Sequence, residues 1–282
     1  MRSARRGGGT DVAGSRPYVR GDNVDQIDWS ATARLSAARN SDEFIVRESY
    51  AEEAPRIVIV ADRRPEMALE FPGRAAFRKR ALQGAAIEAI RASAIEEHGF
   101  VGYLDFGDGS GEPFWLPPHA ESLWEYDERE DEKAPFDAPP DNVAQAIDFL
   151  GAHPRSVPPG TFVFVLSDFL EPVPIASWIR AVEQRLDVVP VVLQDPVWER
   201  TFPPVETFVL RVANARGRVE DVWLSARDVR ALRHTNEERW QRLLAAFSEA
   251  ALEPIVLDSS SPREVLDVFT HWADTRRASF VG

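Results

Sequence analysis

The sequence predicts an α/β fold, with a doubly wound, mostly parallel sheet, helices on both of its faces and a β-rich N-terminal extension. Two observations support this prediction. From residue 56 onward, short runs of apolar, mostly β-branched residues alternate with segments of helical periodicity, which implies right-handed crossovers between parallel strands. These runs are apolar at successive positions, as expected for strands buried on both faces.

The N-terminal part of the chain has a different pattern. Residues 1–15 carry a glycine run without hydrophobic periodicity, so we expect a flexible arm. Residues 16–53 contain scattered aromatic and apolar anchors but no long helical pattern. We expect them to form short strands and turns packed on the body, which then spans residues 54–282.

The first half of the body begins with a β-branched strand over residues 57–61, and helical spacing of apolar residues predicts a helix over 75–97. A strand over 100–106 is followed by a glycine-rich turn and a short strand over 114–116. No helix begins after these glycines and no Lys-Ser/Thr pair follows them, so the turn is predicted to be a hairpin and not a phosphate-binding loop.

The second half continues the alternation. Residues 117–140 are acidic and proline-rich, which indicates a surface segment around a short helix, and 142–150 reads as a helix. The strongest strand signal of the chain covers 161–166. A helix over 173–185 and a buried strand over 188–193 follow.

The C-terminal part is predicted to begin with a hairpin of two strands, 207–212 and 218–224. A long helix over 226–251 leads to a short strand at 254–257, and a last helix covers 262–276.

Two strands of the body end at an aspartate, Asp62 after the first and Asp168 after the strand 161–166. Carboxyl ends of parallel strands meet at one edge of a sheet, where ligands of such folds gather. We therefore expect the functional face at this edge.

Composition excludes several classes of function. The chain has 282 residues, no cysteine and no apolar window long enough to span a membrane, and its basic N-terminus lacks the hydrophobic stretch of a signal peptide. Disulfides, thiolate catalysis and cysteine-ligated zinc are excluded, and we expect a cytoplasmic protein. The five scattered histidines form no metal-binding pair, and no nucleophile elbow, Walker loop or dinucleotide fingerprint occurs.

The net charge of −13 is concentrated in one region: thirteen acidic residues but only two basic ones lie between Asp105 and Asp148. This balance argues against binding to nucleic acid, whose phosphates need a basic surface. An acidic face can steer a basic protein partner. The alternative is a solvated region that keeps the protein soluble.

Two stretches resemble a known family. The segment 16–34 (RPYVRGDNVDQIDWSATAR), followed by Val46-Arg47-Glu48, resembles the signature of the bacterial family called domain of unknown function 58. The second half of that family resembles a von Willebrand factor A domain, which agrees with the predicted body. In the signature, Asp25 and Gln26 stand where the family usually has basic residues, which implies a different charge preference toward a partner.

The resemblance also implies a metal-ion-dependent adhesion site that has degenerated. Von Willebrand factor A domains often hold Mg²⁺ through Asp-x-Ser-x-Ser after the first strand, a later Thr, and an Asp after the fourth strand. The matching positions here are, in order, Asp62, Arg64, Glu66, Asp141 (or Asn142) and Asp168. Only the first and the last of these positions, Asp62 and Asp168, keep the residue type of the metal site.

Two guanidinium groups next to Asp62 would repel a divalent cation. We therefore expect no cofactor, with Arg63 or Arg64 replacing the metal by pairing with Asp62 or Asp168. Two alternatives remain open: a Mg²⁺ site in which Asp62, Glu66 and Asp168 are the ligands and both arginines turn outward, or solvated loop charges without a special role.

The function that the resemblance implies is non-enzymatic protein binding, as an adaptor for a MoxR-type AAA+ ATPase. The expected contacts lie in the signature and in the strand-end loop; they are Asp22, Asp28, Trp29, Arg34 and Arg63. The rival hypotheses are a Mg²⁺-dependent binder or metalloenzyme, and a scaffold that dimerises through its long helices. The oligomeric state does not follow from the sequence.

Overall fold

The computed structural model describes residues 6–18, 27–29, 31–32, 44–50, 54–69, 77–119, 124–131, 134–213 and 219–279. The chain divides into two compact units, Met1–Pro55 and Arg56–Gly282.

The N-terminal unit contains two antiparallel strands, β1 (Arg6–Pro17) and β2 (Ile45–Tyr50), with an isolated bridge between Ile27 and Val46. Residues 6–15, expected as part of a flexible arm, therefore lie in a strand. The glycine run has no side-chain periodicity, but strand pairing uses backbone N–H and C=O groups, which glycine also has. The predicted packing of 16–53 on the body remains a prediction.

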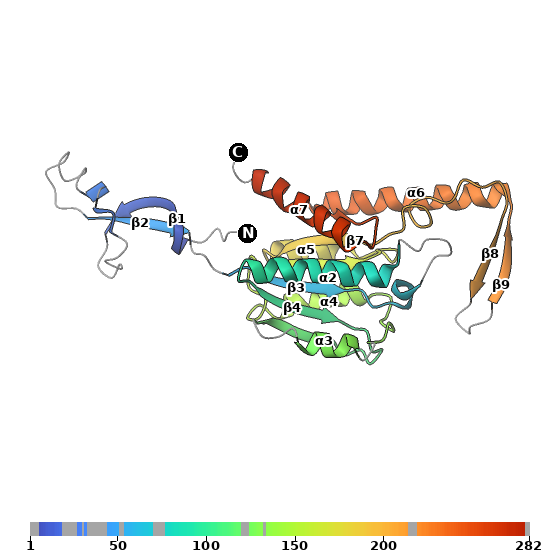
Figure 1. The fold of residues 1–282 in the computed structure, drawn as a ribbon, viewed down its shortest axis with the longest axis horizontal. Helices are drawn as coiled ribbons and strands as arrows, with labels where there is room; N and C mark the ends of the chain where they lie inside the picture. Colours follow the sequence, from blue (N-terminus) through green and yellow to red (C-terminus); the bar gives the residue numbers. More distant parts are fainter. Residues whose placement is uncertain are drawn as a thin grey trace. The chain divides into compact units, whose positions relative to one another are not determined.

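The second unit contains a six-stranded sheet in the order β10-β7-β6-β3-β4-β5 (Figure 1). All its neighbouring strands are parallel except β5, which is antiparallel to β4 across the predicted hairpin turn. The strands are β3 (Arg56–Ala61), β4 (Phe100–Asp105), β5 (Phe114–His119), β6 (Phe162–Ser167), β7 (Asp187–Val192) and β10 (Ile255–Val256). The prediction of a mixed α/β unit with a mostly parallel sheet is confirmed.

Helices cover both faces of this sheet. The helical segments of this unit are η2 (Pro65–Ala68), α2 (Lys79–Glu96), α3 (Trp124–Asp131), α4 (Asn142–Ala152), α5 (Ile175–Glu183), α6 (Ala226–Glu249) and α7 (Pro262–Ser279). Val58 and Val163 belong to one buried cluster with residues of α4 and α5. Phe164 points the other way and contacts Phe269 and Trp272 of α7, as alternation along a strand requires.

The hairpin of β8 (Phe208–Ala213) and β9 (Val219–Leu224) forms a separate two-stranded sheet. It leads directly into α6, which begins with a capping box formed by Ser225 and Asp228. Figure 1 places this hairpin at the N-terminal end of α6, away from the six-stranded sheet.

Candidate functional site

Asp62 and Asp168 follow the neighbouring strands β3 and β6 and lie side by side at the carboxyl edge of the sheet. The pairing of the strands continues into the site, because the backbone N–H of Asp62 donates to the carbonyl oxygen of Leu166 at 2.9 Å. Both carboxylates are 0% exposed. Two buried carboxylates this close require a cation or a proton.

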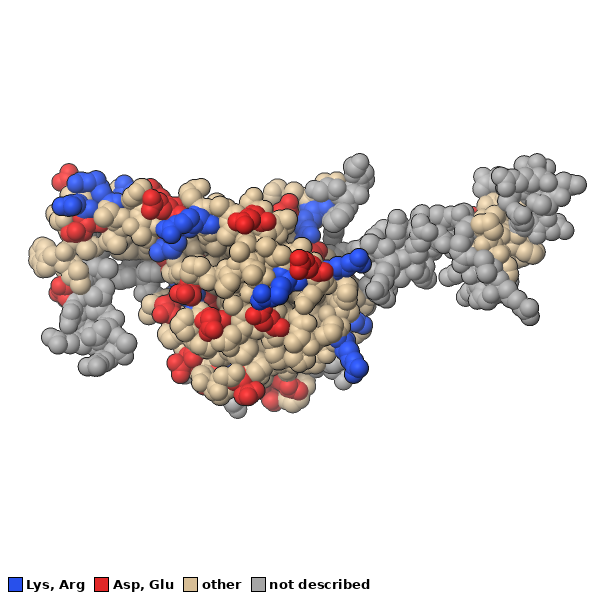
Figure 2. Space-filling view, turned by 180° about the vertical axis from the view of Figure 1, so that it is seen from behind, with Lys and Arg blue, Asp and Glu red and all other residues tan. Residues whose placement is uncertain are grey.

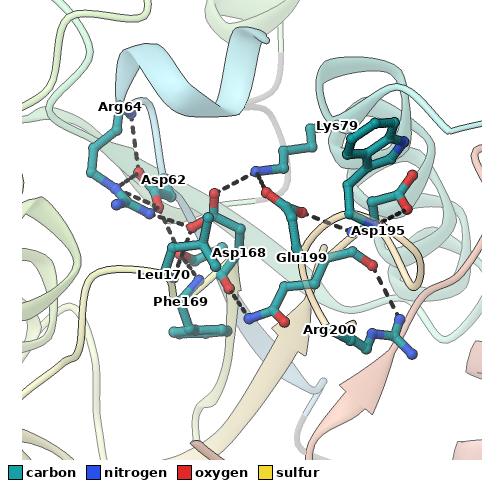
Figure 3. Close-up of polar contacts among 12 residues, drawn as sticks. Asp62, Arg64, Lys79, Asp168, Phe169, Leu170, Asp195, Glu199 and Arg200 are labelled. Carbon is teal, nitrogen blue, oxygen red and sulfur yellow. Dashed lines mark hydrogen bonds and ion pairs between the residues drawn. The ribbon is translucent and has the colours of Figure 1, made fainter. Parts of the chain in front are cut away.

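The cation is the guanidinium of Arg64 (Figure 3). Its Nη2 lies 2.7 Å from Oδ2 of Asp62 and 2.5 Å from Oδ1 of Asp168. Its Nε lies 3.0 Å and 3.1 Å from the two carboxylate oxygens of Asp62, and its backbone N–H donates to Asp62 Oδ1 at 3.0 Å. Of the two arginines considered, Arg64 therefore links the aspartates.

The pKa shifts of Arg64 and Asp168 both favour the charged forms. Burial opposes the charge of Arg64, but its hydrogen bond and charge pairing with Asp62, together with the charge of Asp168, raise its pKa. Burial also opposes the charge of Asp168 and by itself would raise its pKa. The charges of Lys79 and Arg64 outweigh this effect and lower the pKa below its ordinary value. The carboxylate of Asp168 is thus held in its ionised form.

Lys79, the first residue of α2, supplies a second cation and is 2% exposed. Its Nζ lies 2.6 Å from Oδ2 of Asp168 and also forms an ion pair with Glu199. Burial opposes its charge, but Asp168 and Glu199 raise its pKa. Neither Lys79 nor Glu199 was predicted from the sequence. One signal was present: Lys79 is one of only two lysines in the chain, the other being Lys133.

Neutral side chains complete the hydrogen bonding of Asp62. Ser167 Oγ donates to Oδ2 at 2.6 Å, and Asn142 Nδ2 donates to Oδ1 at 3.1 Å. Gln83 Nε2 donates to the backbone oxygen of Asp62 at 2.9 Å. Asn142, at the start of α4, is therefore the contact from the later loop, and its neighbour Asp141 is not.

Glu66 and Asp141 do not join the cluster. Both are exposed, and Asp141 accepts a hydrogen bond from Gln145 at 2.8 Å instead. Of the five positions aligned with a metal site, Asp62, Arg64 and Asp168 come together.

These residues do not fit a Mg²⁺ ion. Such an ion prefers an octahedron of oxygen ligands, whereas the space between the two aspartates holds the nitrogens of Arg64, and Asp168 also binds Lys79. Within the described ranges, no three His, Asp or Glu side chains are arranged to hold a metal ion.

Arg63 points away from Arg64 and lies under α3. Its Nη2 donates to the hydroxyl oxygen of Tyr103 at 2.9 Å and binds Glu130, while its Nε lies 3.4 Å from Asp105. At 1% exposure, Arg63 is buried. Arg63 and Arg64 diverge because neighbouring side chains of extended backbone point in opposite directions, and a role of Arg63 in partner binding stays a prediction.

Two of the expected contacts in the N-terminal unit are described. Trp29 is 62% exposed and meets Phe44 edge-on, with ring centroids 6.0 Å apart. Asp28 is half-buried, and its Oδ1 accepts from the backbone N–H of Ala31 at 2.9 Å. Asp22 and Arg34 lie outside the described residues.

Comparisons with known proteins give one family. The model described as "Protein of unknown function DUF58" matches residues 14–242. No curated protein matches the sequence. No helix in the described part of the chain is long and apolar enough to cross a membrane.

Two solved structures are similar at low identity. An aerotolerance-related membrane protein from Bacteroides fragilis, carrying multiple mutations to serine, is 16% identical over 74% of this chain and 94% of its own, with a TM-score of 0.42. The conserved hypothetical protein BatB from Bacteroides thetaiotaomicron is 14% identical over 78% of this chain and 99% of its own, with a TM-score of 0.45.

Proposed function

The chain belongs to the DUF58 family, and from this premise we propose that it is a non-enzymatic protein-binding module with a von Willebrand factor A-like fold, in which Arg64 replaces the metal ion of the adhesion site. The observation that carries the proposal is the bridge from Arg64 to both Asp62 and Asp168. A guanidinium in this place supplies positive charge between the two carboxylates without any bound ion.

The cluster is suited to holding loops in place and not to chemistry on a substrate. Its ionised groups are all buried and paired with one another. A substrate would have to displace an ion pair and leave a buried charge uncompensated, which costs several kcal/mol. The contacts instead join the loop after β3, the loop after β6 and the start of α2, and so fix the surface that surrounds them.

That surface is an acidic rim at the carboxyl edge of the sheet. We define the rim by five exposed carboxylates on the surrounding loops: Glu66, Asp108, Asp137, Asp141 and Glu171. Figure 2 shows acidic side chains on the lower left of the body, where few basic side chains lie. A surface of this charge favours a basic partner and speeds the encounter with it.

We propose a MoxR-type AAA+ ATPase as this partner, which the family resemblance implies, with a basic patch that faces the rim. The test is the affinity of the purified chain for such an ATPase, measured by biolayer interferometry for the double variant Glu66→Lys/Asp141→Lys. The matched control is Glu96→Lys/Glu97→Lys, which reverses two exposed charges where α2 ends, at the opposite edge of the sheet.

We expect the rim variant to lose tenfold or more in affinity, with a weaker salt dependence, while the control binds like the natural chain. Both variants should remain folded at the temperature of the binding assay, because the four residues are exposed. Equal binding by all three proteins would show that the rim is not the contact surface.

A further inference from the structure

The loop between β7 and β8 connects the charged cluster to α6. The part of this connection that makes the contacts is residues 194–202, named the 194–202 loop below. On the side of the sheet, Glu199 forms the ion pair with Lys79, and Gln194 Nε2 donates to the backbone oxygen of Asp168 at 2.5 Å (Figure 3). Glu199 is also tied into its own loop, because its Oε2 accepts from the backbone N–H of Asp195 at 2.8 Å.

On the side of α6, three side chains one turn apart bind backbone oxygens of the same loop. Arg233 Nη2 donates to the oxygen of Phe202 at 3.0 Å. Asn236 Nδ2 donates to the oxygens of Trp198, at 3.0 Å, and Thr201, and Arg239 Nη2 donates to that of Glu199 at 2.7 Å. Residues with this spacing share one helix face.

The middle of α6 therefore depends on the loop for its position. Between Val229 and Phe247, Asn236 is the only buried residue of the helix, at 8% exposure, while Trp240 and Leu243 are partly buried against the core cluster. Helices in proteins are stabilised mainly by packing an apolar face. Between Val229 and Arg239, hydrogen bonds to loop carbonyls take the place of much of that face. A change in the loop is thus transmitted to α6.

Glu199 is the residue of the loop that forms an ion pair with the cluster. Arg64 and Lys79 together contact three carboxylates, Asp62, Asp168 and Glu199, so negative charge is in excess. Burial raises the pKa of Glu199; Lys79 opposes this shift, Asp168 adds to it, and the N–H of Asp195 lowers it again. The pKa of Asp168 is lowered, so Glu199 loses its charge before Asp168 as the pH falls.

We infer that Glu199 is a releasable latch: when its contact with Lys79 is lost, the 194–202 loop and the middle of α6 loosen together while the six-stranded sheet stays folded. The charged and titratable groups that face the latch are Lys79 from α2, Asp168 after β6, Asp195 from the loop and Arg239 from α6. The β8–β9 hairpin, whose Trp223 is 78% exposed, is attached to the N-terminus of α6 and gains freedom with it. The latch concerns contacts within the chain and stands whether or not a partner binds the acidic rim.

The test is hydrogen–deuterium exchange of the full chain, read by mass spectrometry for the 194–202 loop, for α6 and for strands β3 and β6. Glu199→Gln removes the charge at nearly constant shape, and Glu199→Ala removes the contact entirely. The matched control is Glu206→Gln, the same substitution at an exposed residue.

At pH 7.5 we expect roughly tenfold faster exchange in the loop of Glu199→Ala, which loses the contacts with Lys79 and with the backbone N–H of Asp195. We expect a smaller increase in Glu199→Gln, which loses only the charge. Exchange in α6 should rise in parallel, and exchange in β3 and β6 should not change. In the natural chain acidification should not loosen the loop, because the raised pKa of Glu199 means that protonation favours the closed state over the open one.

Three results would overturn the latch. One is exchange in both Glu199 variants equal to that of Glu206→Gln. Another is an equal increase in β3 and β6, which would make Glu199 a general support of the core. The third concerns Arg233→Ala/Asn236→Ala/Arg239→Ala, which removes the three described side-chain connections from α6 to the loop. If Glu199→Ala still accelerates exchange in α6 in that background, the loop does not transmit the change.

Discussion

The Nη2 atom of Arg64 lies 2.5 Å from Oδ1 of Asp168, although the two residues are 104 positions apart in the chain. The side chain reaches across from the loop after β3 to the loop after β6, and in doing so it also binds the carboxylate of Asp62. One guanidinium thus joins two neighbouring strand ends and compensates buried negative charge on both.

Replacing Arg64 by alanine should therefore destabilise the fold strongly. The substitution leaves two buried carboxylates without this cation, and removing one partner of a buried ion pair typically costs 3–5 kcal/mol. Urea unfolding at pH 7 measures the effect. Arg180→Ala is the control, because the pair of Arg180 with Asp148 is exposed and should contribute less than about 1 kcal/mol. Equal losses in the two variants would mean that the bridge contributes no more than a surface pair.

A divalent cation should not stabilise the natural chain but should stabilise Arg64→Ser/Glu66→Ser. A ligand that binds only the folded state raises the melting temperature, and the natural site is closed by Arg64. Thermal melts with and without millimolar Mg²⁺ or Mn²⁺ make the comparison.

Adding Asp168→Ala to that double variant should abolish its response, because the substitution removes a carboxylate ligand. A metal-dependent rise in the natural chain would contradict the replacement of the ion by Arg64.

The sheet could be predicted from the sequence because its central strands carry their own signal. Residues 57–61, 161–166 and 188–193 coincide with β3, β6 and β7 within one residue at each end, since strands buried on both faces must be apolar at successive positions. The strand β1 could not be predicted, because its pairing with β2 uses backbone groups that no residue pattern reveals.

The candidate site was predictable only where a strand end fixes a position. Asp62 and Asp168 come together because parallel neighbouring strands end at one edge. The choice between Arg63 and Arg64 depends on which way the extended backbone turns after Asp62, and spacing does not determine that. Lys79 reaches Asp168 across 89 residues from a helix start, so no local pattern indicated it.

Stability should be highest over a broad pH range bounded by Asp168 and Lys79. The pKa of Asp168 is lowered from 3.8, so its contribution is present above pH 3.8 and is lost as the pH falls through the lowered value. The pKa of Lys79 is raised from 10.5, so its contribution is present below pH 10.5 and is lost as the pH rises through the raised value. Urea unfolding at a series of pH values measures both limits.

Lys79→Met separates this pair from other titrations. At pH 7 the variant should lose about 3–5 kcal/mol, because Asp168 and Glu199 keep their charges without this cation. Its deficit should shrink on acidification as Glu199, whose pKa burial already raises, takes up a proton. Arg155→Met, at an exposed residue, is the control and should parallel the natural chain. A deficit that does not change with pH would contradict the ionic role of Lys79.

Tyr103→Phe should destabilise the protein by about 1–3 kcal/mol, because the hydroxyl oxygen of Tyr103 accepts from both Nε and Nη2 of Arg63, at 3.2 Å and 2.9 Å. The guanidinium keeps its ion pairs with Asp105 and Glu130, while its Nη1 is buried without a hydrogen-bond partner in the described structure. Tyr126→Phe is the matched control: its ring lies 4.6 Å from that of Tyr103, and its hydroxyl makes no hydrogen bond within the described residues. The control should change the free energy of unfolding by less than about 0.5 kcal/mol. Urea denaturation of both variants decides the matter, and equal effects would show that ring packing, and not the bond to Arg63, is what Tyr103 contributes.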